Sequence, residues 1–304
     1  MLRRNCKLMG NQFEFLLLHE NESFALECYE RAVLEIKRIE GLLSTYKPDS
    51  ETNKINNSAG IEAVIVESEV YHLIERSLKI SRLTQGAFDI SYGSIDNSFW
   101  NFDINMTSLP SKEIAQESVR LINYQNVVLN KENQSIFLEN EGMKIGFGGI
   151  GKGYAADKAK ALLVNLGIEA GVVNASGDII TWGKQENGKD WSVGIADPNQ
   201  KEKPFSYLNI SDLAIATSGN YEKFAVIDNK KYSHTIDPKT GFPCEGIDSV
   251  TIIAPTAELA DALTTPVMVM GVEVGLDLIN QLNGFACVIV DTNNKIFVSK
   301  NIKS

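Results

Sequence analysis

The chain has 304 residues, of which 43% are hydrophobic and 22% charged, which is typical of a globular protein that buries a sizeable core. Its formal net charge is −10 at pH 7. This acidic balance argues against binding to nucleic acid, which requires a basic face. It still allows a nucleotide ligand, because backbone N–H groups and a metal ion can hold phosphates.

The cysteines and the apolar segments bear on the compartment of the protein. The spacing of the cysteines fits neither a zinc site nor a redox pair, so we expect free thiols in a reducing compartment. The four cysteines are Cys6, Cys28, Cys244 and Cys287. Apolar runs are too short to cross a bilayer, and residues 1–7 lead into no apolar signal segment. We therefore expect a cytoplasmic chain without membrane insertion. The alternative is a periplasmic, membrane-anchored protein whose N-terminal signal has been removed.

The first half of the chain is expected to hold one strand, three helices and a hairpin. The strand covers residues 8–18, and a helix capped by Asn21 or Ser23 runs to about residue 43. Pro48 and its neighbours break this helix, since the residue before proline avoids helical geometry. The remaining elements are a helix from Ser68 to the turn at 84–89, a short helix at 112–122 and a hairpin of 127–129 with 136–138.

The second half alternates irregularly between strands and helices. A glycine-rich loop at 146–153 opens a helix that Gly167 can terminate. Later strands are expected at 172–174, 191–195, 207–210, 214–217, 223–227 and 249–253, then helices at 256–270 and 274–281 and a hairpin of 286–290 with 296–299. This order predicts an α+β fold with helices packed on antiparallel or mixed sheets. No shift in composition divides the chain, so we expect a single domain over residues 1–304 in two interlocked lobes.

Residues 233–243, with the sequence SHTIDPKTGFP, are the most distinctive segment of the chain. They contain His234, one of only three histidines, beside a hydroxyl, a carboxylate and a lysine. The prolines and the glycine favour turns, which would hold these polar groups in a rigid loop. Such a loop is typical of a functional site, and the alternative is a surface hairpin.

The loop at 146–153 holds five glycines and opens a helix. Glycine lets the backbone approach a ligand closely, and a helix amino end offers N–H groups to phosphate. Lys152 would add a cation. The spacing matches neither a Walker loop nor a dinucleotide fingerprint, and tight packing of the helix is the alternative explanation.

Asp261 and Thr265 lie four residues apart and therefore share one face of a helix. Their side chains offer the hard oxygen ligands that magnesium prefers. Phosphate, water and a carbonyl from the glycine-rich loop would have to complete the coordination. The alternative is a solvated aspartate beside a threonine that faces its own helix.

Two weaker signals are aromatic. Phe88 beside Asp89, at a turn, could stack on a ring and accept a hydrogen bond from it, and Tyr46 could also face a flat ring. The alternative for the first is a core phenylalanine next to a capping aspartate.

Taken in order, these segments resemble the ApbE family, the FAD:protein FMN transferases, from about residue 8 to residue 300. The matching segments are 8–10, 44–50, 84–90, 148–154, 176–178, 191–198, 217–221, 233–243 and 249–263. The resemblance implies an ApbE-like α+β fold. It also implies Mg²⁺-dependent transfer of FMN from FAD to a threonine or serine of an acceptor flavoprotein, through a phosphoester bond, with release of AMP. The alternatives are an FAD pyrophosphatase that yields FMN and AMP, and a non-catalytic FAD-binding protein.

The resemblance also implies roles for individual residues. His234 matches the base that activates the acceptor hydroxyl. Metal ligands are implied at Gly149, through its carbonyl, and at the side chains of Asp261 and Thr265. The residues that match flavin or adenine contacts are Met9, Tyr46, Ala87, Phe88, Asp89, Lys152 and Ile236. The sequence departs from the family pattern at Gly146, where the family often has aspartate, and at Ser176, which replaces a common glycine.

Overall fold

The computed structural model describes residues 1–96, 98, 100, 106, 108–197, 200–220, 224–227 and 230–302. Its largest feature is an eight-stranded sheet in which all neighbouring strands are antiparallel. In spatial order the strands are β1 (Leu2–Leu8), β2 (Asn11–Leu18), β6 (Ala170–Ala175), β7 (Asp178–Trp182), β10 (Ala214–Gly219), β13 (Ile247–Ala254), β14 (Ala286–Asp291) and β15 (Ile296–Val298). The N-terminal hairpin is joined to the rest through β2 and β6, which pair from Phe13 with Ala175 to Leu18 with Ala170.

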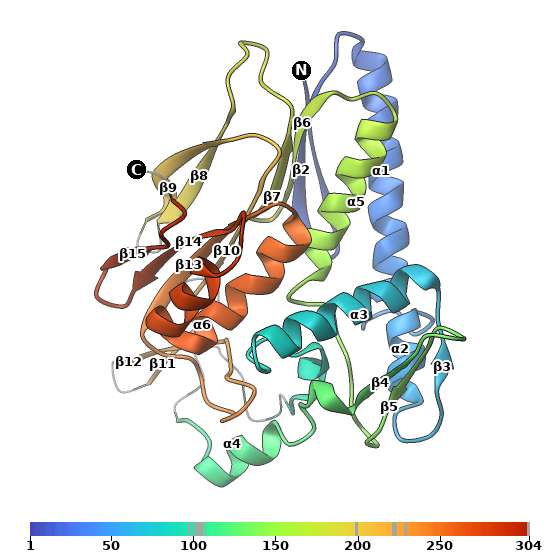
Figure 1. Ribbon diagram of the computed structural model, residues 1–304, viewed down its shortest axis with the longest axis vertical. Helices are drawn as coiled ribbons and strands as arrows, with labels where there is room; N and C mark the ends of the chain where they lie inside the picture. The colour runs from blue at the N-terminus through green and yellow to red at the C-terminus, as the bar shows by residue number, and fades with distance from the viewer. Residues whose placement is uncertain are drawn as a thin grey trace.

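Three helices cover one face of this sheet: α1 (Glu22–Leu43), α5 (Gly151–Asn165) and α6 (Ala257–Asn280) (Figure 1). They lie there because each has an apolar face, which in α1 includes the buried Ala32, Ile36 and Ile39 at helical spacing. Small residues on α5, among them Ala155 and Ala159, let it pack closely between its neighbours.

A second region lies below the large sheet in Figure 1. It consists of α2 (Glu51–Asn57), α3 (Ser68–Leu83) and a small sheet of β3 (Val64–Ile65), β5 (Ser135–Leu138) and β4 (Val127–Asn130). Its buried side chains, such as Leu73 and Ile136, belong to the same core cluster as Phe13 and Ile252 of the large sheet. One continuous core therefore joins the two regions. The combination of helices with antiparallel sheets confirms the expected α+β fold.

The remaining elements surround a smaller core. They include α4 (Lys112–Ser118) and a hairpin of β11 (Phe224–Ile227) with β12 (Lys230–Ser233). Ala115, Ala225 and Ile236 are buried together in a separate cluster between them. A further hairpin pairs β8 (Trp191–Asp197) with β9 (Gln200–Ile210).

Several expected elements have different boundaries. The strand expected at 8–18 begins only at Asn11, as β2, because Met9 and Gly10 adopt positive φ angles of 50° and 75° and turn the chain between β1 and β2. The helix expected at 112–122 ends at Ser118. The strand expected at 223–227 begins at Phe224 in the structure, and Lys223 lies outside the described residues. β7 and α2 were not expected.

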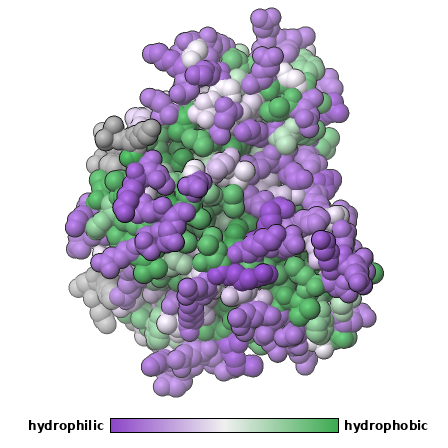
Figure 2. Space-filling view, viewed as in Figure 1, coloured by the Kyte–Doolittle hydropathy of each residue, from purple (hydrophilic) through white to green (hydrophobic). Residues whose placement is uncertain are grey.

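The two expected C-terminal helices follow one another within α6 and are separated by a kink at Gly271, where φ is 80°. By length and composition alone α6 is apolar enough to cross a membrane, which the separate apolar runs of the sequence did not indicate. In this fold it is a core helix that packs on β10 and β13. Figure 2 shows polar and apolar side chains intermixed on the face that carries it.

Candidate functional site

A polar pocket of about 110 Å³ lies at one end of the large sheet. β2 and β7 begin there and β6 and β10 end there, so side chains from distant parts of the chain converge. The lining residues are Asn11, Lys152, Ser176, Asp178, Thr217, Ser218, Gly219, His234, Thr235 and Thr265. Three predicted site residues, Lys152, His234 and Thr265, are thus brought to one cavity.

Lys152 carries the positive charge of the pocket. Its Nζ donates a hydrogen bond to Oδ2 of Asp178 and lies 3.6 Å from Oδ1 of Asp261. The two aspartates are 4% and 5% exposed. Burial by itself would lower the pKa of Lys152, but the charges of Asp261 and Asp178 outweigh it and raise that pKa above the ordinary value. The lysine therefore stays protonated between the two carboxylates.

Asp261 and Thr265 lie one turn apart on α6, as the sequence predicts. Oδ2 of Asp261 accepts a hydrogen bond of 3.1 Å from the backbone N–H of Gly153, at the amino end of α5. Between them in sequence, Thr264 accepts from Ser218 Oγ at 2.8 Å and donates to the Asp261 carbonyl at 2.8 Å. These contacts fix the face of α6 that carries Asp261 and Thr265.

The glycine-rich loop is tightly packed at one glycine and open at another. A Cβ atom on Gly153 would lie 2.1 Å from the carbonyl oxygen of Ala257, so the packing explanation holds at this position. A Cβ on Gly148 would meet nothing within 4 Å. Gly149 lies in the turn before α5 against Phe88, whose ring would be 3.6 Å from an added Cβ. Close packing of α5 on α6 thus coexists with an open stretch of backbone.

His234 follows β12 in a hairpin whose shape is set by local polar contacts. Ser233 bonds Asn220 through its side chain and accepts from the N–H of Thr235 at 3.0 Å. Asp237 closes the turn by accepting from the Lys239 N–H at 2.9 Å and from Thr240 Oγ1 at 3.1 Å. The segment is therefore a hairpin, but one that directs His234 and Thr235 into the pocket.

Most of the residues predicted to contact the nucleotide lie outside this pocket lining. Asp89 accepts from Ser91 and from the N–H of Tyr124, and it caps the short helix η1 (Ile90–Ser94). Burial raises its pKa. This geometry matches the capping alternative for Asp89. Ala87 and Phe88 are buried beside it.

The other predicted contacts are scattered. Tyr46 is 96% exposed, and Ile236 is 1% exposed within the small core cluster. Met9 turns the chain between β1 and β2 and packs against the main core. Among the predicted nucleotide contacts, Lys152 alone belongs to the described lining of the pocket, so the roles of the others stay predictions.

Sequence reasoning missed the role of Asp178. The sequence places Asp178 only within a segment that resembles a family motif, because its pairing with Lys152 depends on how the β6–β7 turn meets α5. A usable signal was present: an aspartate directly after Ser176 and Gly177, at the start of an apolar strand, is expected to be buried and paired. Ser218 and Asn11 were likewise missed as pocket residues.

The oxygen atoms of Asp261 and Thr265 fit a magnesium ion whose remaining ligands would come from a substrate and water. In the portions of the chain that are described, no three His, Cys, Asp or Glu residues are grouped so as to hold a metal ion on their own. Asp261 and Thr265 supply two hard oxygens, and magnesium commonly completes its octahedron with phosphate oxygens and water. The pocket is thus suited to a phosphate-containing ligand, with a cation on one side and a histidine on the other.

The fold and the pocket together define an α+β protein with a polar, charged pocket at one end of its large sheet. The chain belongs to the ApbE family, whose family model matches residues 9–289. It is 31% identical to the FAD:protein FMN transferase of Escherichia coli (strain K12), over 98% of this chain and 87% of that protein. It is 29% identical to the protein of that name from Klebsiella pneumoniae (strain 342), over 96% and 90%.

Solved structures agree with this assignment. The crystal structure of the ApbE protein from Thermotoga maritima is 30% identical and superposes with a TM-score of 0.88, covering 98% of this chain and 97% of that chain. The flavin transferase ApbE from Vibrio cholerae is 25% identical, with a TM-score of 0.82 and coverage of 98% and 97%.

Proposed function

We propose that this chain transfers FMN from FAD to a threonine or serine of an acceptor flavoprotein through a phosphoester bond, and releases AMP. The observation that carries the proposal is that Lys152, held by two buried carboxylates, lines the same cavity as His234 and Thr265. Membership of the ApbE family supports the reaction class.

The helical side of the pocket would hold the diphosphate of FAD. Lys152 provides positive charge where the phosphates carry negative charge. Asp261, Thr265 and the carbonyl of Gly149 would hold a magnesium ion. When bound, that ion would neutralise charge on the diphosphate.

The hairpin side of the pocket would receive the acceptor. Its hydroxyl oxygen forms a bond to the FMN phosphorus while the bond from that phosphorus to the oxygen shared with the AMP phosphate breaks. The hydroxyl proton passes to a ring nitrogen of His234, and the electron pair of the broken bond leaves with AMP. A hydroxyl is a weak nucleophile until a base takes its proton, which is the task given to His234.

One incubation separates the three candidate functions. The protein is mixed with FAD, MgCl₂ and a purified flavoprotein acceptor, and the products are resolved on a denaturing gel viewed under ultraviolet light and by chromatography of the nucleotides. A fluorescent acceptor band together with AMP supports the proposal. FMN and AMP without a fluorescent band would instead indicate a pyrophosphatase. Unchanged FAD bound to the protein would indicate a binding protein. The same mixture with EDTA is the control for the metal.

A further inference from the structure

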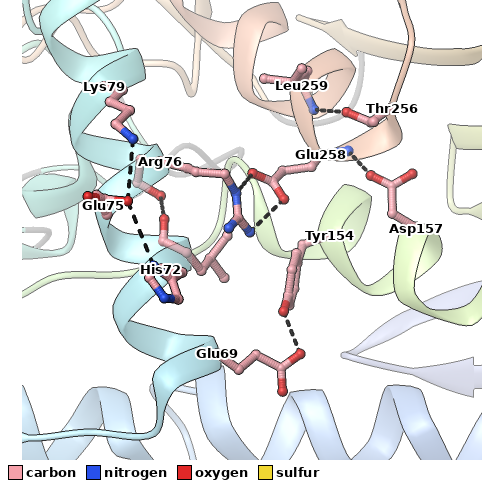
Figure 3. Close-up of polar contacts among 12 residues, drawn as sticks. Glu69, His72, Glu75, Arg76, Lys79, Tyr154, Asp157, Thr256, Glu258 and Leu259 are labelled. Atoms are coloured by element: carbon pink, nitrogen blue, oxygen red, sulfur yellow. Dashed lines mark hydrogen bonds and ion pairs between the residues drawn. The ribbon is translucent and has the colours of Figure 1, made fainter. Parts of the chain in front are cut away.

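The first turn of α6 is held by side chains that come from other helices (Figure 3). Thr256 caps the helix from within its own segment, accepting from the N–H of Leu259 at 3.3 Å. Asp157 of α5 adds a second cap, with Oδ1 accepting from the N–H of Ala257 at 2.9 Å and Oδ2 from the N–H of Glu258 at 2.8 Å. Both oxygens of one carboxylate are therefore committed to the start of α6.

A second attachment comes from α3. Arg76 donates from Nε to Oε1 of Glu258 at 2.6 Å and from Nη2 to Oε2 at 3.0 Å, a two-pronged pair that fixes direction as well as distance. The guanidinium also lies 5.7 Å from the ring centre of Tyr154, whose hydroxyl donates to Glu69 at 2.5 Å. Figure 3 shows Arg76 from α3 and Asp157 from α5 both reaching Glu258 at the start of α6.

The joint between α5 and α6 works in both directions. α5 caps α6 through Asp157, and α6 in turn accepts from the N–H of Gly153 through Asp261. Gly153 and Asp157 are one turn apart on α5, so they share a face. The missing side chain of Gly153 allows the Ala257 carbonyl to lie against the α5 backbone. A shift of α6 along α5 would therefore break the Asp157 cap and move Asp261 together.

We propose that Asp157 is a positioning residue for the metal-binding side of the pocket: by fixing the first turn of α6 against α5, it sets where Asp261 and Thr265 lie relative to Lys152. The proposal rests on the proposed function. Asp157 lies outside the described lining of the pocket, so it acts through α6 and not by touching the ligand. Groups that support a metal ligand from behind typically change metal affinity by about 10-fold to 100-fold when they are altered.

The test compares Asp157→Asn with Glu51→Gln in the full-length protein. Asparagine has the same shape but only one acceptor oxygen, so it cannot receive both N–H groups. Glu51 also accepts from a backbone N–H, that of Glu67 at 3.2 Å, but in the region of the small sheet. It therefore controls for the general effect of neutralising a carboxylate cap.

Two measurements are made on each variant. The first is the dissociation constant of FAD in MgCl₂ and in EDTA, by calorimetry. The second, in the absence of any ligand, is hydrogen exchange of the amides at 257 and 258. We expect Asp157→Asn to weaken FAD binding in MgCl₂ by about 10-fold or more, to leave binding in EDTA within about 2-fold, and to speed exchange at both amides. Glu51→Gln should match wild type in all three.

Two results would overturn the inference. If wild-type FAD binding responds to magnesium but Asp157→Asn keeps the same response, Asp157 does not position the ligands, and the proposed function stands. If magnesium does not alter FAD binding to the wild type at all, both the positioning role and the shared metal site fail.

Discussion

The two sides of the pocket are built on contacts of different range. On the helical side, Asp157 meets Ala257 across 100 residues of sequence and Gly153 meets Asp261 across 108. On the hairpin side, the contacts of Asp237 with Lys239 and Thr240 span two and three residues. The helical side also belongs to the main core, whereas Ile236 of the hairpin lies in the smaller cluster.

Because of this difference, we expect the helical side to affect both stability and the reaction, and the hairpin side to affect mainly the reaction. Groups that hold charge must be fixed against the whole fold, because an unpaired buried carboxylate or lysine is costly. The hairpin presents His234 mainly through its own turn, although the Ile236 N–H also donates to Tyr92 Oη at 3.3 Å and Ser233 bonds Asn220. Substitutions on the helical side are therefore expected to change stability and metal response together, while substitutions of the presented side chain on the hairpin should change the reaction alone.

The largest effect is expected at Asp261. Asp261→Ala removes the charged oxygen ligand and one of the two carboxylates that hold Lys152, so FMN transfer should fall by about 1,000-fold or more. The measurement is the rate of acceptor labelling at saturating FAD and MgCl₂, with circular dichroism to verify the fold. Activity within a few fold of wild type would contradict the metal assignment.

His234→Ala tests the hairpin side. The variant should bind FAD nearly as the wild type does but transfer FMN about 100-fold more slowly, which is the usual range for a lost general base. Binding and the saturated transfer rate are measured separately. Loss of FAD affinity with an unchanged saturated rate would assign His234 to nucleotide binding. An unchanged rate and affinity would mean that no protein base is needed, since a metal ion can itself acidify a bound hydroxyl.

Gly153→Ala tests how tightly the helical side is packed. The new Cβ would lie 2.1 Å from a backbone carbonyl oxygen, which cannot move without shifting α6. We expect the free energy of unfolding to fall by about 3 kcal/mol, measured by urea denaturation. Gly148→Ala in the same loop is the matched control, because its Cβ meets nothing within 4 Å, and it should stay within about 0.5 kcal/mol of wild type. Equal stability of the two variants would show that α5 and α6 are not in close contact.

The smallest effect concerns pH. Burial raises the pKa of Asp157 from its ordinary 3.8 to about 6. The hydrogen bonds from the N–H groups of Glu258 and Ala257 lower this pKa but do not outweigh burial. Of the nearby charges, Glu258 raises the pKa and Lys160 lowers it. Between these values the folded chain holds a proton that the unfolded chain has released. The contribution of Asp157 to the free energy of unfolding therefore decreases as pH rises from about 4 to about 6 and stays lower above that range.

Asp157→Asn removes this contribution. The difference in unfolding free energy, wild type minus variant, should decrease by on the order of 2 kcal/mol across that pH range, less than the full shift because the side chain is partly exposed. Urea denaturation of both proteins at about pH 4.5 and about pH 7 measures it. A difference independent of pH would show that Asp157 has an ordinary pKa.

The contrast in contact range also explains what the sequence could reveal. The Asn21 cap of α1, the β4–β5 hairpin and the pair Asp261 and Thr265 follow from neighbours a few residues away, and each lies where it was expected. The packing role of Gly153 and the partnership of Asp178 with Lys152 depend on segments that meet only in three dimensions. The spacing of residues along the chain does not indicate which distant segments make such contacts.

The error at residues 8–18 has a local cause of a different kind. Phe13, Phe15 and Leu17 alternate, but Leu8 lies five residues before Phe13 and is out of phase with them. The left-handed geometry of Met9 and Gly10 turns the chain between the two sets. Methionine rarely adopts a positive φ, so the signals for this turn are Gly10 and the change of phase.

The pairing of β2 with β6 has a consequence for how the chain reaches this structure. The N-terminal hairpin is complete by Leu18, yet its inner edge gains a partner only when residues 170–175 are available. To form a pairing so distant in sequence, the chain must lose the entropy of closing a large loop before the strand contacts stabilise it, and this slows folding. During synthesis, about half of the polypeptide is made between β2 and its partner β6, and until then the edge of β2 is unpaired. An unpaired strand edge can form hydrogen bonds with a wrong strand. Because Asn11 and Thr265 line the same cavity, the pocket assembles only after the helix that carries Thr265 has been made.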